Sequence, residues 1–281
     1  MRTRIAILVM FVASFASRAN ASDAPNIVFI LADDLGWKDV GFMGSTYYRT
    51  PHLDRLASES LVFTDAYSAG PNCSPTRASL LTGAWTPRHR LYSPGRSDKA
   101  PRRLMTLRTP PIPTTLDPEW VTLAEALHTH VGAAMGKWHM GDDPDRGPLA
   151  QGFEVNVGGT RAGHPPAGYF APFRLPNLED APEGSYLTER LTDEAIAFLE
   201  TPRDRPFFLY LAHYAVHTPL PAPEAMVNAY RDVPGADGQD NPTYAAMVES
   251  LDTSVGRVLE ALERLGLADD TIVIFSSDNG G

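Results

Sequence analysis

The stretch NIVFILADD, residues 26–34, places an apolar run directly before two aspartates. An apolar run without polar alternation is typical of a parallel strand that is buried on both faces. Parallel strands are joined by crossover connections that are usually helices, so this segment indicates an α/β fold. A second apolar run, 271–275, is also followed by polar side chains that include Asp278 and Asn279.

The rest of the chain alternates between candidate strands and candidate helices, and its length fits one large α/β domain or two small ones. Strands are expected at 61–67, 132–136, 207–212 and 271–275, the last of them buried. Helices are expected at 52–60, 73–81, 121–130, 186–200 and 243–265. Two long segments rich in Pro, Gly or Arg, 88–115 and 146–183, predict surface loops.

Acidic and amide side chains follow the first and the last expected strands. Asp33 and Asp34 come after the first strand, and Asp278 and Asn279 come after the last. A turn or cap role is the commoner explanation for one such pair, whereas two pairs favour a shared site at the carboxyl ends of the strands. Carboxylate and amide oxygens suit Ca²⁺ or Mg²⁺ better than zinc.

The N-terminus has the pattern of a secretory signal peptide. Arg2 and Arg4 precede an apolar run that ends in small residues up to Ala21. The apolar run is too short for a membrane-spanning helix. We therefore expect a signal peptide at 1–21, cleavage after Ala21, and a secreted or periplasmic domain at 22–281 with no remaining membrane attachment.

The overall charge argues against one class of partner, nucleic acid. The formal net charge is −10, which argues against a nucleic-acid partner because nucleic-acid-binding domains usually carry a basic face. A small anionic substrate stays compatible with this charge, since a few cationic side chains and a metal ion can set the local sign.

Cys73 is the only cysteine in the sequence, so no internal disulfide can form. A lone exposed thiol is a liability in the oxidising compartment that an exported protein reaches. Cys73 is therefore expected either to be buried and inert or to take part in chemistry.

The segment around Cys73, PNCSPTRASLLTG at 71–83, resembles the signature of the sulfatase family with its Cys-x-Pro-x-Arg core. Asn72 is a mild departure outside that core. Other segments resemble further family elements in the family's order: 27–37, Gly136-Lys137-Trp138-His139, His217-Thr218-Pro219 and 277–281. The Gly-Tyr-x-Thr stretch that usually precedes the second of these is not recognisable. The resemblance covers essentially all of the mature chain.

This resemblance implies a fold and a chemistry. The fold would be alkaline-phosphatase-like, with a mixed, mostly parallel central sheet flanked by helices. In the family, a formylglycine-generating enzyme oxidises the signature cysteine during export, and the hydrate of the resulting formylglycine attacks a sulfate ester. The substrate would be a small-molecule or glycan sulfate ester, with sulfated carbohydrates expected for an exported sulfatase.

The resemblance also implies roles for single residues. The ligands of one divalent ion, Ca²⁺ with Mg²⁺ as the alternative, would be Asp33, Asp34, Asp278, Asn279 and the hydrate of residue 73. Arg77 would hold this hydrate and the ligand cluster in place. Lys137 would contact a sulfate oxygen, and His139 the hydrate. His217 would contact sulfate or donate the proton to the leaving group.

Further residues are weaker candidates. His213 is expected either to line the substrate pocket or to pack in the core. Three residues after the signature helix could reach substrate: Trp85, Arg88 and His89.

Family members continue beyond the point that corresponds to Gly281, with another active-site Lys and a smaller C-terminal subdomain. We therefore expect an incomplete catalytic domain with uncovered sheet edges, and little or no turnover by residues 1–281 alone. Three alternatives stay open: a phosphate or phosphonate monoester hydrolase on the same scaffold, an inactive remnant, and a thiol hydrolase that uses Cys73 with His139 or His217.

Overall fold

The computed structural model of the protein describes residues 24–95, 101–107, 111–179 and 181–280. Its centre is a parallel sheet in the order β3-β2-β4-β1-β5. The strands are β1 (Asn26–Ala32), β2 (Val131–Gly136), β3 (Val155–Val157), β4 (Phe207–Ala212) and β5 (Thr271–Ser277). Every pairing between these strands is parallel in the described part of the chain, which agrees with the mostly parallel sheet that was expected. The expected signal peptide, 1–21, lies outside the described residues.

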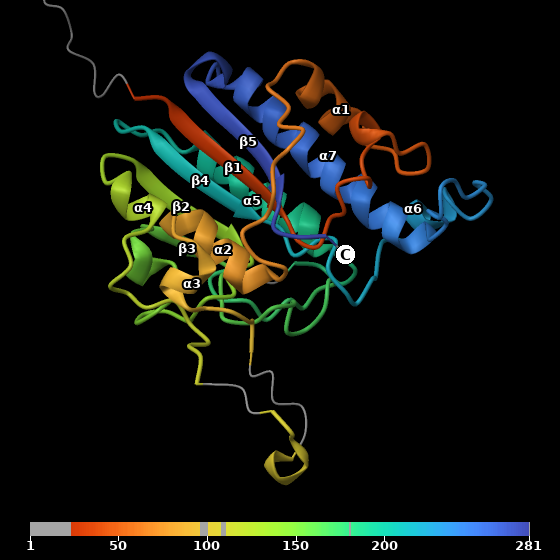
Figure 1. Cartoon of the computed structure of the whole chain (residues 1–281). Coiled ribbons are helices and arrows are strands. Elements are labelled where there is room, and N and C mark those ends of the chain that lie inside the picture. Colours follow the sequence, from red (N-terminus) through yellow and green to blue (C-terminus); the bar gives the residue numbers. More distant parts are fainter. Residues whose placement is uncertain (1–23, 96–100, 108–110, 180, 281) are drawn as a thin grey trace, which may run out of the picture.

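Helices cover both faces of this sheet and confirm the α/β class (Figure 1). The α-helices are α1 (Pro51–Ser58), α2 (Cys73–Thr82), α3 (Thr86–His89), α4 (Leu123–Ala126), α5 (Leu187–Glu200), α6 (Glu224–Asn228) and α7 (Pro242–Arg264). Short 3-10 helices lie at Gly41–Met43, Arg102–Leu104, Leu149–Gln151 and Ala268–Asp270. One core cluster joins the sheet to α1, α5 and α7, and a second joins it to α2 and α4. No helix in the described ranges is both long and apolar enough to cross a bilayer.

The first strand is buried because it has neighbours on every side. It pairs with β4 on one edge and β5 on the other, with Ile30 opposite Leu211 and Phe275. Its side chains alternate between the two faces, so that Ile30 joins the cluster of α5 and α7, and Leu31 joins that of α2. An uninterrupted apolar run is what a strand in this position requires.

The long helix α7 begins and ends as its sequence predicts. The Asn241 side chain accepts hydrogen bonds from the N–H groups of Thr243 and Tyr244, at 3.0 and 3.1 Å, and Pro242 occupies the first helical position. Its apolar stripe is buried against the sheet and α5. The expected helix at 243–265 is therefore confirmed to within one residue at each end.

Two strand predictions need correction. The segment 61–67 forms no strand, and its apolar side chains are exposed, with Leu61 at 88% and Phe63 at 79%. A run with high strand propensity needs a partner strand, and none of the five described strands pairs with it. The last strand, β5, is present but not buried. It is an edge strand with Ile272 and Ile274 partly exposed, because the core cluster on that face contains no β5 residue.

Two connecting segments also differ from expectation. The helix expected at 121–130 is confined to α4, which starts at a capping box between Thr122 and Glu125 and ends as the chain turns into β2. The excursion 146–183 includes β3, which pairs with β2 and extends the sheet by one strand. Three residues are too few for strand periodicity to be visible in a sequence.

His213 belongs to the core. Its side chain is fully buried, and its Nε2 lies 2.8 Å from the Ser254 hydroxyl, which in turn bonds Thr192 at 2.6 Å. These three residues link the exit of β4 to α7 and α5. Of the two roles considered for His213, packing is therefore the one that the structure supports.

We predict that Leu211→Ala lowers the free energy of unfolding by about 3 kcal/mol, because it leaves a cavity between β1 and β2 at a fully buried position. The matched control, Leu61→Ala, removes an exposed side chain and is expected to change the same quantity by less than about 0.5 kcal/mol. Urea unfolding of the two variants checks this. Equal losses for both variants would contradict the burial described above.

A second prediction concerns acid stability. Burial lowers the pKa of His213 from 6.5 to about 3, so unfolding in this pH range takes up a proton at this position. The stability linked to His213 is present above pH 6.5 and is lost as the pH falls towards 3. His213→Asn is expected to reduce the slope of unfolding free energy against pH in this window by up to about 1.4 kcal/mol per pH unit.

The measurement is urea unfolding at several pH values across that window. The control is His164→Asn at an exposed position, which is expected to leave the slope as it is in the wild type. An unchanged slope for His213→Asn would contradict the prediction.

Candidate active site

Four strands of the parallel sheet send polar residues to the same edge. Asp33 follows β1, Asp278 follows β5, Lys137 follows β2, and His217 lies on the segment after β4. The carboxyl ends of parallel strands meet at one edge, which is where open α/β sheets place their sites. The sequence predicted this convergence for the two acidic pairs, and the structure brings β1 and β5 side by side.

The acidic residues form a compact group with the cysteine. Ligand atoms of Asp33, Asp34, Cys73 and Asp278 all lie within 4.8 Å of one another. Asp34 adopts a left-handed backbone (φ 59°), which Asp tolerates better than most residues. Its N–H donates to Asp278 Oδ1 at 3.1 Å, and its Oδ1 accepts from Asn279 Nδ2 at 2.5 Å. All five residues expected to bind a metal therefore lie together.

Two buried cations hold this group. The Arg77 guanidinium donates to Asp278 Oδ2 from Nε at 2.9 Å, and a second nitrogen lies 2.8 Å from the same oxygen. Arg77 also donates to the carbonyl of Lys137 at 2.5 Å. The Lys137 ammonium donates to Asp33 Oδ2 at 2.5 Å. The side chains of both cations and of the two aspartates that they bind are fully buried, whereas the Asp34 carboxylate is partly exposed. The burial of Arg77 excludes a surface salt bridge as its role.

We call Asp33, Asp34, Arg77, Lys137 and Asp278 the charged cluster. Burial raises the pKa of Asp33 to about 8 against the opposing charges of Lys137 and Arg77. Burial also acts on Asp278, but there the charges of Arg77 and Lys137 prevail and lower the pKa. Removing one partner from such a group leaves an uncompensated buried charge, which typically costs several kcal/mol.

Cys73 lies at the first turn of α2, with its Sγ 3.8 Å from Asp34 Oδ1. Pro75 fits in this turn because the first N–H groups of a helix have no intrahelical partner, and Gly83, in a left-handed conformation, ends the helix. Burial and the nearby Asp33 carboxylate raise the pKa of the Cys73 thiol to about 12. The helix N-terminus therefore does not make this residue a thiolate.

His139 is buried and neutral. Its backbone is left-handed (φ 66°), and its N–H donates to the Thr160 carbonyl at 2.7 Å. Its own carbonyl accepts from the Ser74 hydroxyl at 2.8 Å. Burial, reinforced by the charges of Lys137 and Arg77, lowers the pKa of His139 to about 3. Its Nδ1 has no hydrogen-bond partner among the described residues.

His217 is the more accessible histidine, with 23% of its side chain exposed. Its Nδ1 lies 2.5 Å from the Thr218 carbonyl, which requires a proton on Nδ1. Its Nε2 lies 3.6 Å from Asp34 Oδ2 and faces the charged cluster. Burial and the Lys137 charge lower the pKa of His217, which favours the neutral ring with a free lone pair on Nε2.

The oxygens of this site fit a hard divalent cation. Three carboxylates converge, and the Oδ1 atoms of Asp33 and Asn279 are buried without a hydrogen-bond partner in the part of the chain that the structure describes. Buried polar atoms are rarely left unpaired in proteins, so such atoms are suited to an ion. Carboxylate and amide oxygens are typical ligands of Ca²⁺ and Mg²⁺.

The three weaker candidates lie away from the cluster. Trp85 is 69% exposed. The Arg88 guanidinium lies 5.9 Å from the centre of the Trp120 ring, and the His89 ring bonds the Ser79 hydroxyl at 2.9 Å. The contacts that residues of segment 158–170 make with His139 and His217 were not predicted from the sequence. A Gly- and Pro-rich segment carries no periodic signal.

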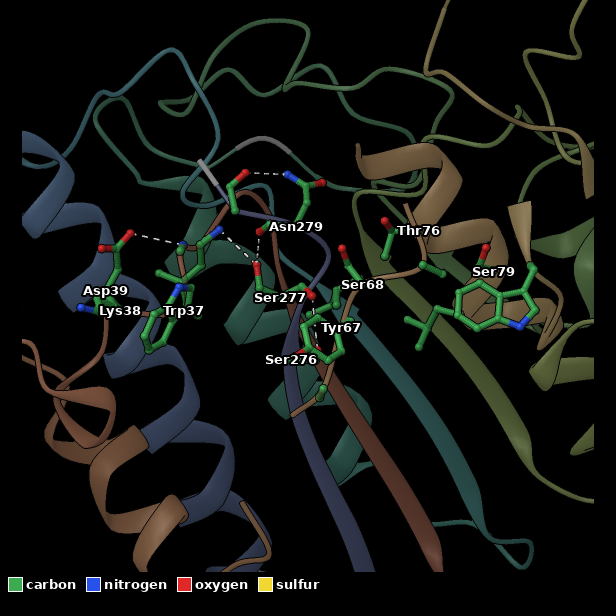
Figure 2. A pocket seen from close by; sticks show the side chains of 18 of the residues that line it. Trp37, Lys38, Asp39, Tyr67, Ser68, Thr76, Ser79, Ser276, Ser277 and Asn279 are labelled. Atoms are coloured by element: carbon green, nitrogen blue, oxygen red, sulfur yellow. Dashed lines mark hydrogen bonds between the residues drawn. The ribbon is translucent and has the colours of Figure 1, made fainter. Parts of the chain in front are cut away.

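A hollow of about 950 Å³ lies beside the site (Figure 2). Its lining includes Trp37, Tyr67 and Trp85 together with hydroxyl groups of Ser276 and other residues. Asn279 also lines it, but no residue of the charged cluster does. The charged and titratable groups are therefore located at the cluster and not in this hollow.

Comparisons with known proteins identify the family of this chain. The family model described as Sulfatase matches residues 25–281. N-acetylgalactosamine-6-sulfatase of Mus musculus is 36% identical over 93% of this chain and 51% of its own length. Steryl-sulfatase of Mus musculus is 31% identical over 97% of this chain and 54% of its own length.

A solved structure, that of Ps i-CgsB in complex with k-i-k-neocarrahexaose, matches with a TM-score of 0.72 and 33% identity, and covers 92% of this chain and 59% of that chain. The chain spans about half the length of the curated relatives named above. Because the family model matches nearly all of the residues that the structure describes, this chain belongs to the sulfatase family.

Proposed function

We propose that these residues form the catalytic metal site of an enzyme that hydrolyses sulfate esters of sulfated carbohydrates. The observation that carries the proposal is the position of Cys73, whose thiol lies among three carboxylates, two of which, Asp33 and Asp278, are paired with Arg77 and Lys137. The names of similar proteins support the substrate class, since one is an N-acetylgalactosamine-6-sulfatase and another was solved with k-i-k-neocarrahexaose.

An unmodified thiol is a poor nucleophile in this position. Burial and the Asp33 carboxylate raise the pKa of the thiol to about 12 when no ion is bound, which disfavours the reactive thiolate. A thiolate that attacks sulfur would also form a thiosulfate ester, which has no neighbouring hydroxyl group to expel the sulfate again. Both arguments favour an oxidised residue 73 over the thiol hydrolase alternative.

Formylglycine at residue 73 removes both difficulties. One hydroxyl of its hydrate loses a proton and attacks sulfur, while the ester oxygen leaves with a proton. Loss of the proton from the second hydroxyl then re-forms the aldehyde as the bond to sulfate breaks. Water adds to the aldehyde and restores the hydrate, so that the sum of the steps is hydrolysis.

The side chains around residue 73 have separate tasks in this proposal. Asp33, Asp34, Asp278 and Asn279 hold a divalent ion, which supplies positive charge for the sulfuryl oxygens and favours the ionised nucleophile. Arg77 fixes the Asp278 carboxylate through two nitrogens, a fork geometry that lysine cannot provide. Lys137 pairs with Asp33, and in this proposal the same ammonium donates to a sulfate oxygen.

The histidines differ in environment and therefore in role. His139, buried and neutral, orients the hydrate by hydrogen bonding. His217 is partly exposed, and the proton on its Nδ1 is committed to the Thr218 carbonyl. In this proposal the ring takes up a second proton on Nε2, which faces the cluster, and delivers it to the leaving alcohol.

The maturation and location belong to the same proposal. Conversion of Cys73 requires a formylglycine-generating enzyme during export. The basic and apolar start of the sequence supplies the export signal, with cleavage after Ala21. The mature protein is then secreted or periplasmic.

Metal binding is tested with Asp34→Asn, which keeps the shape of the side chain and removes one negative charge. We expect calcium to raise the melting temperature of the wild-type protein and to bind the variant at least about tenfold more weakly, because a carboxylate a few ångströms from the ion contributes more than about 1.4 kcal/mol. Titration calorimetry and thermal unfolding give the two readouts. The control, Asp65→Asn, lies at an exposed position, and an equal calcium response in both variants would exclude Asp34 as a ligand.

The nucleophile is tested in the protein expressed from its native gene together with a formylglycine-generating enzyme. Mass spectrometry of the peptide that contains residue 73 is expected to find an aldehyde in place of the thiol. We also expect turnover of an aryl sulfate well above that of the matching aryl phosphate, and loss of this turnover in Cys73→Ala. Aryl sulfate hydrolysis that persists in Cys73→Ala would refute the proposed nucleophile, and a preference for the phosphate would favour a phosphate monoesterase.

A further inference from the structure

Segment 158–170 touches both candidate catalytic histidines, although it contributes no side chain to the charged cluster. The Thr160 carbonyl accepts the His139 N–H at 2.7 Å. Farther along, the Tyr169 hydroxyl lies 2.8 Å from the His217 carbonyl and 2.6 Å from the Tyr214 carbonyl. These contacts come from one continuous stretch of chain and reach two residues that follow different strands.

Gly163 lies directly against the His139 ring. A Cβ atom at Gly163 would be 2.5 Å from Cε1 and 2.7 Å from Nε2 of that ring, closer than real Cβ contacts allow. No other residue type therefore fits here while the ring keeps its place. The atoms that a methyl group would meet are the far end of a side chain, so the ring would move and the backbone would not have to.

Tyr169 fixes the turn that carries His217. Its side chain is almost fully buried and packs on Tyr186, with ring centres 6.0 Å apart. A hydroxyl has one proton, which here is shared between two backbone carbonyls three residues apart. The two carbonyls belong to Tyr214 and His217, the first and last residues of the turn after β4. The Tyr169 hydroxyl therefore fixes the direction in which the backbone of His217 leaves the sheet.

The segment is itself anchored at both ends. Asn156, which belongs to β3, accepts the Gly159 N–H at 2.9 Å and donates to the Gly159 carbonyl at 3.0 Å. The Arg161 N–H donates to Asp142 at 2.8 Å. At the other end, Phe170 pairs with Tyr186 next to α5. A segment held in this way can position the side chains that it touches.

We propose that segment 158–170 is a positioning element for both histidines, in which Gly163 seats the His139 ring and Tyr169 holds the backbone of His217. This inference rests on the proposed function for its kinetic consequences. Its structural part concerns only where two imidazole rings lie, and it can be measured without turnover.

The test uses Gly163→Ala and Tyr169→Phe, each with a matched control. Gly95→Ala adds the same methyl group where no atom lies within 4 Å, and Tyr244→Phe removes a hydroxyl that donates to the Asp39 carboxylate away from segment 158–170. The first readout is the NMR spectrum of isotope-labelled histidine, in which the signals are assigned with variants that lack His139 or His217. We expect Gly163→Ala to move the His139 signals alone and Tyr169→Phe to move the His217 signals alone.

The second readout is steady-state kinetics of the matured protein expressed from its native gene. We expect Gly163→Ala to lower kcat by about tenfold to a hundredfold, with little change in KM or melting temperature, because misplacing a reacting group by about 1 Å has effects of this size. Tyr169→Phe is expected to slow esters of poor leaving groups more than aryl sulfates, since only the former depend strongly on the proton from His217. The controls are expected to match the wild type.

The outcomes separate this inference from the proposed function. If the wild-type protein hydrolyses no sulfate ester while each variant still moves its own histidine signals, the proposed function fails and the positioning element stands. If the variants leave both sets of histidine signals in place, the positioning element is refuted, whatever the turnover. The positioning element would also be refuted if a variant lowered the melting temperature and shifted the signals of both histidines together. That result would indicate a general packing role for the segment.

Discussion

The burial of opposite charges at the carboxyl edge of the sheet is the constraint on which the rest of the site depends. Asp33 and Asp278 are fully buried, and each needs a cation within contact distance to stay there. Arg77 reaches them from α2 and Lys137 from the end of β2, so the helix and three strands are fixed relative to one another by charge as well as by packing. The first turn of α2, with Cys73, is thereby placed against Asp34.

This arrangement also sets the electrostatics of the site. Three carboxylates face two cations, which leaves a formal charge of −1 if all five groups are ionised. Such a site attracts a divalent cation, and a bound divalent ion would change the sum to +1, the sign that an anionic sulfate group requires. The chain as a whole carries −10, so affinity for an anion depends on this local balance and not on the net charge.

Much of this could be predicted from the sequence, for reasons that particular residues make clear. The apolar run before Asp33 and the capped, periodic helix α7 are strong local signals, and both are confirmed. The position of Asp278 next to Asp33 followed from the rule for parallel strands once two strands ended in acids. The segment 61–67 shows the limit of local signals, since strand propensity cannot form a strand that has no neighbour. The supports of the histidines could not be predicted either, because a glycine at 163 or a tyrosine at 169 acquires its role only through a contact across the fold.

The central claim is that the oxygens of Asp33, Asp34, Asp278 and Asn279 form one metal site beside residue 73. The most direct measurement is a crystal structure of the matured protein grown with Ca²⁺, in which the ion is identified by anomalous scattering. We expect one ion with oxygens of all four side chains at about 2.3–2.6 Å. An ion bound elsewhere, or a cluster in which these oxygens bind no ion at saturating calcium, would contradict it.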